Sequence, residues 1–207
     1  MRIAYLNCFA GISGDMFLAA LIDAGVDPQV LHDATAALNL GASLKIEKTD
    51  RSGISATRVQ VFDGTHLAEE TRQSPDHVPP AKNHDHTHPH RHLNSIRKII
   101  QAANLPAEVQ QTAIQTFELL GASEAKIHNL DIEKIHFHEV GAIDAIVDIT
   151  AASAGIHALH IEKWYSSPLN VGGGMVDCAH GHFPVPAPAT ADLLHDLPTY
   201  SAHVEKE

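Results

Sequence analysis

The sequence predicts an α+β fold, with a small sheet covered by several helices and a disordered histidine-rich loop. The predicted order of elements is β-α-α-β-β-loop-α-α-α-β-α, which does not alternate strictly as a doubly wound sheet requires. The apolar signal also vanishes between residues 65 and 92. We therefore expect an N-terminal α+β part over residues 1–64, the loop over 65–92, and the remainder of the same domain over 93–207.

The N-terminal part begins with RIAYLNC, which predicts a short buried strand, followed by the turn AGISG. A helix opens at Asp15 and stops near Gly25, and Pro28 suits the first turn of a second helix. Residues 43–64 alternate apolar and polar side chains on either side of a turn, which predicts two strands.

Three helices are predicted directly after the loop, because apolar residues recur at helical spacing. They lie in LNSIRKIIQAAN, in the segment that opens at Pro106, and in a segment that starts near Gly141 or Asp144. KWYSSPLNV then predicts a strand, GGG a sharp turn, and PVPAPATADLLHDL an extended segment that ends in a helix.

Composition excludes several classes of protein. The 207 residues include 14 Lys and Arg against 25 Asp and Glu, and a formal net charge of -11 disfavours nucleic acid as a partner. Two cysteines, with no signal peptide and no long apolar run, predict a cytoplasmic protein that does not insert into a membrane. The 17 histidines are far above the usual share, which points to metal binding or pH sensitivity.

The first candidate site is NCFAGISGDM, between the first strand and the first helix. Gly11, Ser13 and Gly14 could form a turn that binds a phosphate-bearing cofactor at the helix N-terminus. The stretch lacks the spacing and the lysine of a Walker motif, and spacing alone favours a tight turn with Asp15 as helix cap. Cys8 is either a soft metal ligand or a small buried apolar residue.

The second candidate site is HFHEVGAIDAIVDI, which contains His136, His138, Glu139, Asp144 and Asp148. The two histidines share a side if their segment is extended, and the two aspartates stack on one face if theirs is helical. Like charges in such apolar surroundings are costly unless a cation neutralises them, so we expect a metal site here. The alternative is that the polar side chains are solvated and that Asp144 caps the helix.

The third candidate site is GGGMVDCAHGHFPVPAPAT. Gly173 and Gly174 let the backbone approach a cofactor closely, while Cys178, His180 and His182 suit nickel, copper or zinc better than magnesium. The alternative is a surface hairpin followed by a stiff proline segment.

The fourth candidate site is the histidine-rich stretch HDHTHPHRH, inside the predicted loop. Alternating imidazoles in such a segment make a loose chelator for late first-row metals. Its histidines are His84, His86, His88, His90 and His92.

Most of the chain outside the loop carries a family resemblance, through NCFAGISGDMFLAALIDAGV, RHLNSIRKII, EAKIHNLDIEKIHFHEVGAIDAIVDI and CAHGHFPVPAPATADLL. These stretches resemble the nickel-insertion protein family of nickel-pincer cofactor biosynthesis (LarC). The resemblance implies CTP-dependent insertion of Ni(II) into pyridinium-3,5-bisthiocarboxylic acid mononucleotide, with a carbon–nickel bond formed and Mg or Mn required. It also implies that the histidine-rich segment gathers nickel.

Two departures from the family pattern affect these expectations. Asn7 stands where family members often carry an acid, which would weaken a metal or nucleotide site there. The family's C-terminal domain is not found before the sequence ends at residue 207. We therefore expect CTP to bind through the C-terminal half of the family protein, as a partner, and this chain alone to be an incomplete nickel chelatase or cyclometallase. A homo-oligomer is also compatible with the sequence.

The main hypothesis is that the candidate sites fold toward one cavity that grips a transition ion. His138, Glu139, Asp144 and Asp15 are the candidate catalytic residues, and a carboxylate or imidazole would accept the ring proton as the carbon–nickel bond forms. His136, Asp148, His180, His182 and the histidines of the loop are the candidate metal ligands. The alternatives are a nickel-storage protein acting through the loop and a metal-dependent hydrolase.

Overall fold

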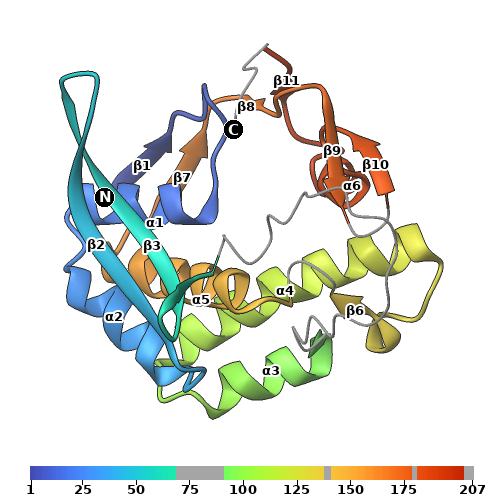
Figure 1. Ribbon diagram of the computed structural model, residues 1–207, viewed down its shortest axis with the longest axis horizontal. Helices are drawn as coiled ribbons and strands as arrows, with labels where there is room; N and C mark the ends of the chain where they lie inside the picture. Colours follow the sequence, from blue (N-terminus) through green and yellow to red (C-terminus); the bar gives the residue numbers. More distant parts are fainter. Residues whose placement is uncertain (69–90, 138–140, 179–180, 203–207) are drawn as a thin grey trace.

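The computed structural model describes residues 1–68, 91–137, 141–178 and 181–202 (Figure 1). The helices are α1 (Gly14–Asp23), α2 (Pro28–Ala37), α3 (Leu93–Ala102), α4 (Ala107–His128), α5 (Ile143–Ala158) and α6 (Pro188–Leu193). The strands are β1 (Ile3–Leu6), β2 (Ala42–Arg51), β3 (Ile54–Asp63), β4 (His66–Leu67), β5 (Arg91–His92), β6 (His136–Phe137), β7 (Lys163–Ser166), β8 (Leu169–Asn170), β9 (Met175–Cys178), β10 (Gly181–Pro184) and β11 (Thr199–Tyr200). The α+β class is confirmed, although the strands form several small sheets rather than one.

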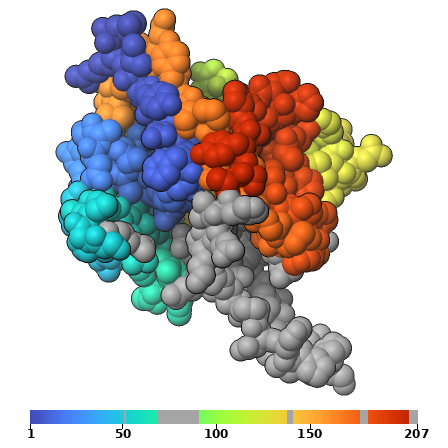
Figure 2. All heavy atoms as spheres, turned by 90° about the horizontal axis from the view of Figure 1, so that it is seen from above, coloured from blue at the N-terminus to red at the C-terminus, as the bar shows by residue number. Residues whose placement is uncertain are grey.

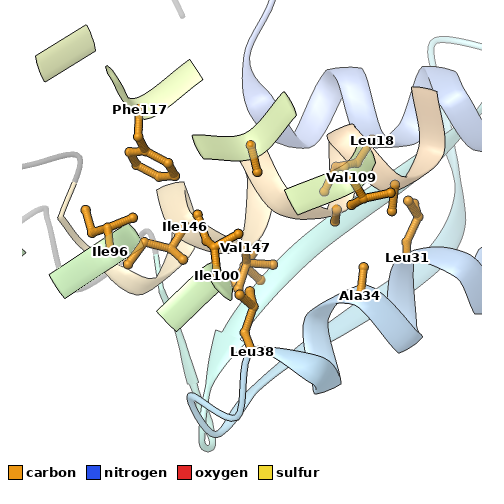
Figure 3. Close-up of a cluster of buried hydrophobic side chains, with 14 of the residues drawn as sticks. Leu18, Leu31, Ala34, Leu38, Ile96, Ile100, Val109, Phe117, Ile146 and Val147 are labelled. Carbon is orange, nitrogen blue, oxygen red and sulfur yellow. The ribbon is translucent and has the colours of Figure 1, made fainter. Parts of the chain in front are cut away.

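Helix α5 is the centre of the packing, and it contacts α1, α2, α4 and β3. Figure 3 shows that the buried side chains around it come from every one of the first five helices. Ile146 and Val147 of α5 are fully buried, as are Leu18 of α1 and Phe117 of α4. Burial of this kind contributes about 1.5–3 kcal/mol for each large side chain, so the helical core holds α5 in place.

The predicted hairpin forms as β2 and β3, in register from Ala42 opposite Asp63 to Arg51 opposite Ile54. Ser52 and Gly53 join the strands with positive φ values of 55° and 85°, as a tight hairpin turn requires. The Asp50 carboxylate accepts a hydrogen bond from the Gly53 amide at 2.9 Å, which reinforces the turn.

The predicted strand at the N-terminus is present, but the expectation that it is buried was wrong. β1 pairs in parallel with β7, and alternate side chains point to opposite faces of this two-stranded sheet. Ile3 is 49% exposed and Tyr5 is 65% exposed, because no described element covers the outer face.

The long predicted helices agree with the structure in position. Asp27 caps α2, since its carboxylate accepts from the Gln29 amide at 2.9 Å, and Pro28 takes the first helical position as expected. α4 ends at Asn129 in the left-handed conformation, which satisfies the last helical carbonyls. Within the described ranges, no helix is long and apolar enough to cross a membrane.

Candidate functional site

Helix α1 meets helix α5 at Gly14, the first residue of α1. A β-carbon at Gly14 would lie 2.6 Å from Cγ and 2.8 Å from Cβ of Asp148, so only glycine fits this position. The Ser13 hydroxyl donates a hydrogen bond to the Asp15 carboxylate. The first candidate site therefore lies against Asp148 of the second candidate site.

The interpretation of Asp15 as the helix cap was wrong, because Ser13 occupies the N-cap position and makes no side-chain capping bond. Asp15 lies instead in the first turn of α1, where a carboxylate interacts favourably with the helix dipole. Asp15 and Asp148 thus both belong to the α1–α5 junction.

Asp144 lies one turn before Asp148 on α5, as the four-residue spacing predicts. Its environment differs, since Asp144 is only 5% exposed. The two carboxylates share a helix face, but Asp144 is buried, whereas Asp15 and Asp148 are partly exposed residues and Oδ1 of Asp148 is itself buried.

The two-residue strands β5 and β6 place His92 directly opposite His136. Their ring centroids are 3.7 Å apart and the ring planes are inclined by 47°. His92 Nδ1 is buried and has no hydrogen-bond partner within the described part of the chain, whereas His136 is exposed. The last histidine of the histidine-rich stretch therefore meets the first histidine of HFHEVGAIDAIVDI.

Gly141 connects this histidine pair to α5. A β-carbon at Gly141 would lie 2.7 Å from the Phe137 carbonyl oxygen, and the Arg91 guanidinium donates to the Gly141 carbonyl at 2.8 Å. Burial lowers the pKa of Arg91 from its usual value, and the nearby Asp63 carboxylate partly offsets this shift. The β5–β6 ladder is thus packed against the segment that leads into α5.

Asn170 joins the two glycine-rich segments. Its side-chain nitrogen donates to the Phe9 carbonyl at 2.8 Å, and its Oδ1 accepts from the Gly172 amide at 3.1 Å. A β-carbon at Gly11, where φ is +79°, would lie 3.3 Å from the Asn170 carbonyl oxygen. Figure 2 shows the N-terminal segment, in blue, beside the C-terminal segment, in red, on this face.

The glycine and histidine residues of the third candidate site have different surroundings. A β-carbon at Gly173 would lie 3.2 Å from Ser201 Oγ, and Gly174 has a positive φ of +96°. Cys178 and His182 belong to the β9–β10 hairpin, in which His182 is exposed and opposite Asp177.

Several predicted site residues lie outside the described ranges, namely His138, Glu139, His180, His84, His86, His88 and His90. Among the residues that are described, no group of three or more His, Cys, Asp and Glu side chains forms a metal site. Cys8 is buried, with 3% exposure, and its amide donates to the Ser167 hydroxyl at 2.9 Å. This setting agrees with the interpretation of Cys8 as a small buried residue.

Sequence reasoning missed two residues that organise the site, Asn170 and Arg91. An asparagine in the otherwise apolar stretch PLNV was the available signal for Asn170, which the structure places at 6% exposure. Arg91 stands between two histidines of the histidine-rich stretch and gave no separate signal. Its hydrogen bond to the Gly141 carbonyl joins residues 50 positions apart in the sequence. The described contacts run from His92 and His136 through Gly141 to α5, and from Asp148 to the glycine-rich turns.

The comparisons with known proteins all indicate the same family. The model of the family described as "Nickel insertion protein" matches residues 4–207. A protein of Desulfitobacterium hafniense (strain DSM 10664 / DCB-2), named pyridinium-3,5-bisthiocarboxylic acid mononucleotide nickel insertion protein, is 46% identical over 208 residues, which are 100% of this chain and 46% of that protein.

Two further relatives give the same picture. A protein of the same name from Geobacillus kaustophilus (strain HTA426) is 42% identical over 100% of this chain and 48% of its own length. A putative nickel insertion protein of Geobacter metallireducens (strain ATCC 53774 / DSM 7210 / GS-15) is 41% identical over 97% of this chain and 47% of its own. No solved structure matches.

The chain therefore spans about half the length of the curated relatives that it matches. The family match covers nearly every residue, including all four stretches that carry the resemblance. The chain belongs to the nickel insertion protein family.

Proposed function

We propose that this chain is the nickel-handling half of a protein that inserts nickel into pyridinium-3,5-bisthiocarboxylic acid mononucleotide. The observation that carries the proposal is the similarity of the whole chain, at 46% identity, to a relative named for that insertion. The meeting of His92 and His136 supports it, because imidazole is a ligand suited to nickel.

Insertion replaces a ring hydrogen of the precursor by nickel. The carbon–nickel bond forms from the electron pair of the ring carbon–hydrogen bond, so a proton must leave to a base, and the oxidation state of Ni(II) does not change. The thiocarboxylate sulfurs supply soft ligands to the same ion. Asp15 is the carboxylate that we propose for accepting the proton, because Asp144 and Oδ1 of Asp148 are buried.

The N-terminus of α1 does not fit CTP. A triphosphate at a helix N-terminus needs free amide groups and cationic side chains, whereas Asp15 and Asp148 put two carboxylates at the N-terminus of α1. We therefore propose that CTP and its Mg or Mn ion bind the C-terminal half found in the longer relatives, and that this half completes the activity.

The test is reconstitution with the C-terminal half of the Desulfitobacterium hafniense relative. Nickel incorporation into the precursor would be measured with CTP and Mg for each half alone and for the two halves together. We expect turnover only with both halves, and at least tenfold slower turnover for Asp15→Asn. Asp33→Asn on the exposed side of α2 is the control and should leave turnover unchanged. Equal activity without this chain would contradict the proposal.

A further inference from the structure

We propose that His92 and His136 form a two-imidazole nickel site through which the metal passes toward the carboxylates of the α1–α5 junction. The inference rests on the proposed function, which supplies the destination of the metal. The site itself is defined only by residues that the structure describes. Its test therefore begins with nickel alone.

The backbone fixes the pairing of the two histidines. His92 and His136 are opposite each other in an antiparallel pair, where facing side chains point to the same side with β-carbons about 4.5–5.5 Å apart. Strands of two residues are marginal by themselves, but their neighbours anchor them. Leu93 is fully buried and Phe137 is 3% exposed, with its ring 6.2 Å from that of Phe117. Both imidazoles therefore start from fixed main-chain positions.

His92 has an unused nitrogen. It occupies the N-cap of α3, a position normally taken by residues whose side chains accept a backbone hydrogen bond, yet it makes no capping bond. Its buried Nδ1 has no hydrogen-bond partner among the described residues. Because a buried polar atom without a partner is unfavourable, this nitrogen is available to a ligand that accepts its lone pair.

The geometry requires one local movement. An ion bound in cis by two imidazoles at about 2.0–2.1 Å holds their ring centroids roughly 4.5–5 Å apart, which is more than the observed 3.7 Å. The exposed His136 ring can open by about 1 Å through its side-chain torsions, while His92 stays in place. Nickel binding should therefore separate the two rings without moving β5 or β6.

The electrostatic setting favours transfer over storage. His92 is next to the N-terminus of α3, and Gly141 brings the N-terminus of α5 close to the pair; both helix ends carry partial positive charge. No third ligand joins the two imidazoles within the described ranges, so water would fill the other positions. Such a site exchanges its ligands readily, and the thiocarboxylate sulfurs can replace imidazole nitrogen on Ni(II) with no change in oxidation state.

Two sequence neighbours suit this role. His90 lies two residues before His92, so the histidine-rich stretch ends in the sequence at the pair. Asp144 lies in the first turn of α5, after Gly141, and Asp148 follows one turn later on the same helix. Nickel would thus travel from many weak ligands to two imidazoles and then to the carboxylates.

The first experiment measures nickel binding in the full chain. His84, His86, His88 and His90 are replaced by Asn, and NiCl₂ is titrated by calorimetry. We expect this variant to keep one nickel per chain, and the further substitution His136→Ala or His92→Ala to weaken its binding at least tenfold. His195→Ala, an exposed histidine paired with Asp196, is the matched control and should change nothing. Equal affinity in all these variants, or no binding by the fourfold variant, would overturn the proposal.

A second measurement needs no substitution of His92 or His136, so it does not depend on whether the variants fold. In the otherwise intact chain, substoichiometric nickel should broaden the ring-proton resonances of His92 and His136 before those of other described histidines. Broadening confined to other histidines would contradict the site.

Reconstitution with the C-terminal half separates this inference from the proposed function. At limiting nickel, His136→Ala should slow insertion about tenfold, and excess nickel should restore most of the rate. If the variant is as fast as the wild type at limiting nickel, the transfer site is wrong although insertion stands. If the wild-type pair inserts no nickel, the proposed function fails whatever nickel binding shows.

Discussion

The two ends of HFHEVGAIDAIVDI differ in how freely their side chains can move, although both ends contain possible metal ligands. At the β6 end, His136 is exposed and its ring lies beside that of His92 at an inclination of 47°, so it can change its orientation. At the α5 end, Asp144 is buried and Asp148 is pressed against Gly14. A side chain with room to rotate can capture and release an ion, whereas a side chain held by packing can only present a fixed group.

This difference suits β6 to capturing a metal ion and α5 to holding carboxylates in fixed positions. Phe137, next to His136 in the sequence, belongs to the fixed part. Its buried ring holds the β6 backbone in place and so sets the direction of the His136 side chain. Substitutions that disturb packing should therefore reduce stability, while substitutions of His136 should reduce metal binding at nearly constant stability.

The largest expected effect follows from Phe137→Ala, which empties the core beneath β6. Removing a fully packed phenylalanine typically costs about 3–5 kcal/mol of unfolding free energy. Phe137 is 3% exposed and packs edge-on against Phe117. Urea denaturation of the metal-free chain measures the loss, with Leu119→Ala, 65% exposed on α4, as a control expected within about 0.5 kcal/mol. Equal losses in both variants would show that β6 is not anchored by packing.

The next largest effect should come from Gly14→Ala at the α1–α5 junction. The added methyl would lie 2.6 Å from Asp148 Cγ, so the helices must separate, at a cost of about 1–3 kcal/mol. Asp148→Ala should restore part of this loss in the double variant, with a coupling of at least about 0.5 kcal/mol by urea denaturation.

Gly121→Ala on α4 is the control for this pair. Its methyl would lie 3.2 Å from the Leu93 side chain, a longer approach than at Gly14, so its cost should be smaller. Additive effects of Gly14→Ala and Asp148→Ala would contradict a tight junction.

Local patterns predicted most of the fold. Apolar residues at helical spacing placed α1 to α5, and alternation around Ser52 and Gly53 placed the β2–β3 hairpin. The same patterns failed at β1, where Ile3 and Tyr5 have strand propensity but no described neighbour to cover them. Propensity identifies a strand, whereas burial depends on what packs against it.

The meeting points of the site were not accessible from local patterns. His92 and His136 are brought together by a pair of two-residue strands, and no periodicity signals elements so short. The bond from Asn170 to Phe9 joins residues 161 positions apart, and the contact of Gly14 with Asp148 depends on how two helices cross. Residue chemistry identified candidate ligands, but only packing determines which of them meet.

A smaller effect should distinguish two buried threonines that have different partners. Thr150 lies on α5 shortly after Asp148, and its hydroxyl is buried with no hydrogen-bond partner in the described residues. Thr35 on α2 is equally buried, but its hydroxyl donates to the Leu31 carbonyl at 2.8 Å. Thr150→Val should therefore stabilise the chain by up to about 1 kcal/mol, and Thr35→Val should destabilise it by about as much. Thermal unfolding measures both, and a loss at Thr150 would reveal a polar contact within the α5 end.

The smallest expected effect concerns the acid sensitivity of the chain away from α5. A hydrogen bond from Lys126 lowers the pKa of Asp192 from its usual value, and the Ser123 hydroxyl, 3.0 Å from the carboxylate, adds to the shift. Because the pKa is lower in the folded state, the stabilisation is present above the unfolded pKa and is lost as the pH falls through the lower folded-state pKa.

Lys126→Met should therefore lower the urea midpoint slightly at pH 7, and the difference from the wild type should shrink below about pH 4. His128→Ala, on the same last turn of α4, is the control for changes in that turn. A difference that grows toward low pH would reverse the sign and exclude this ion pair as its source.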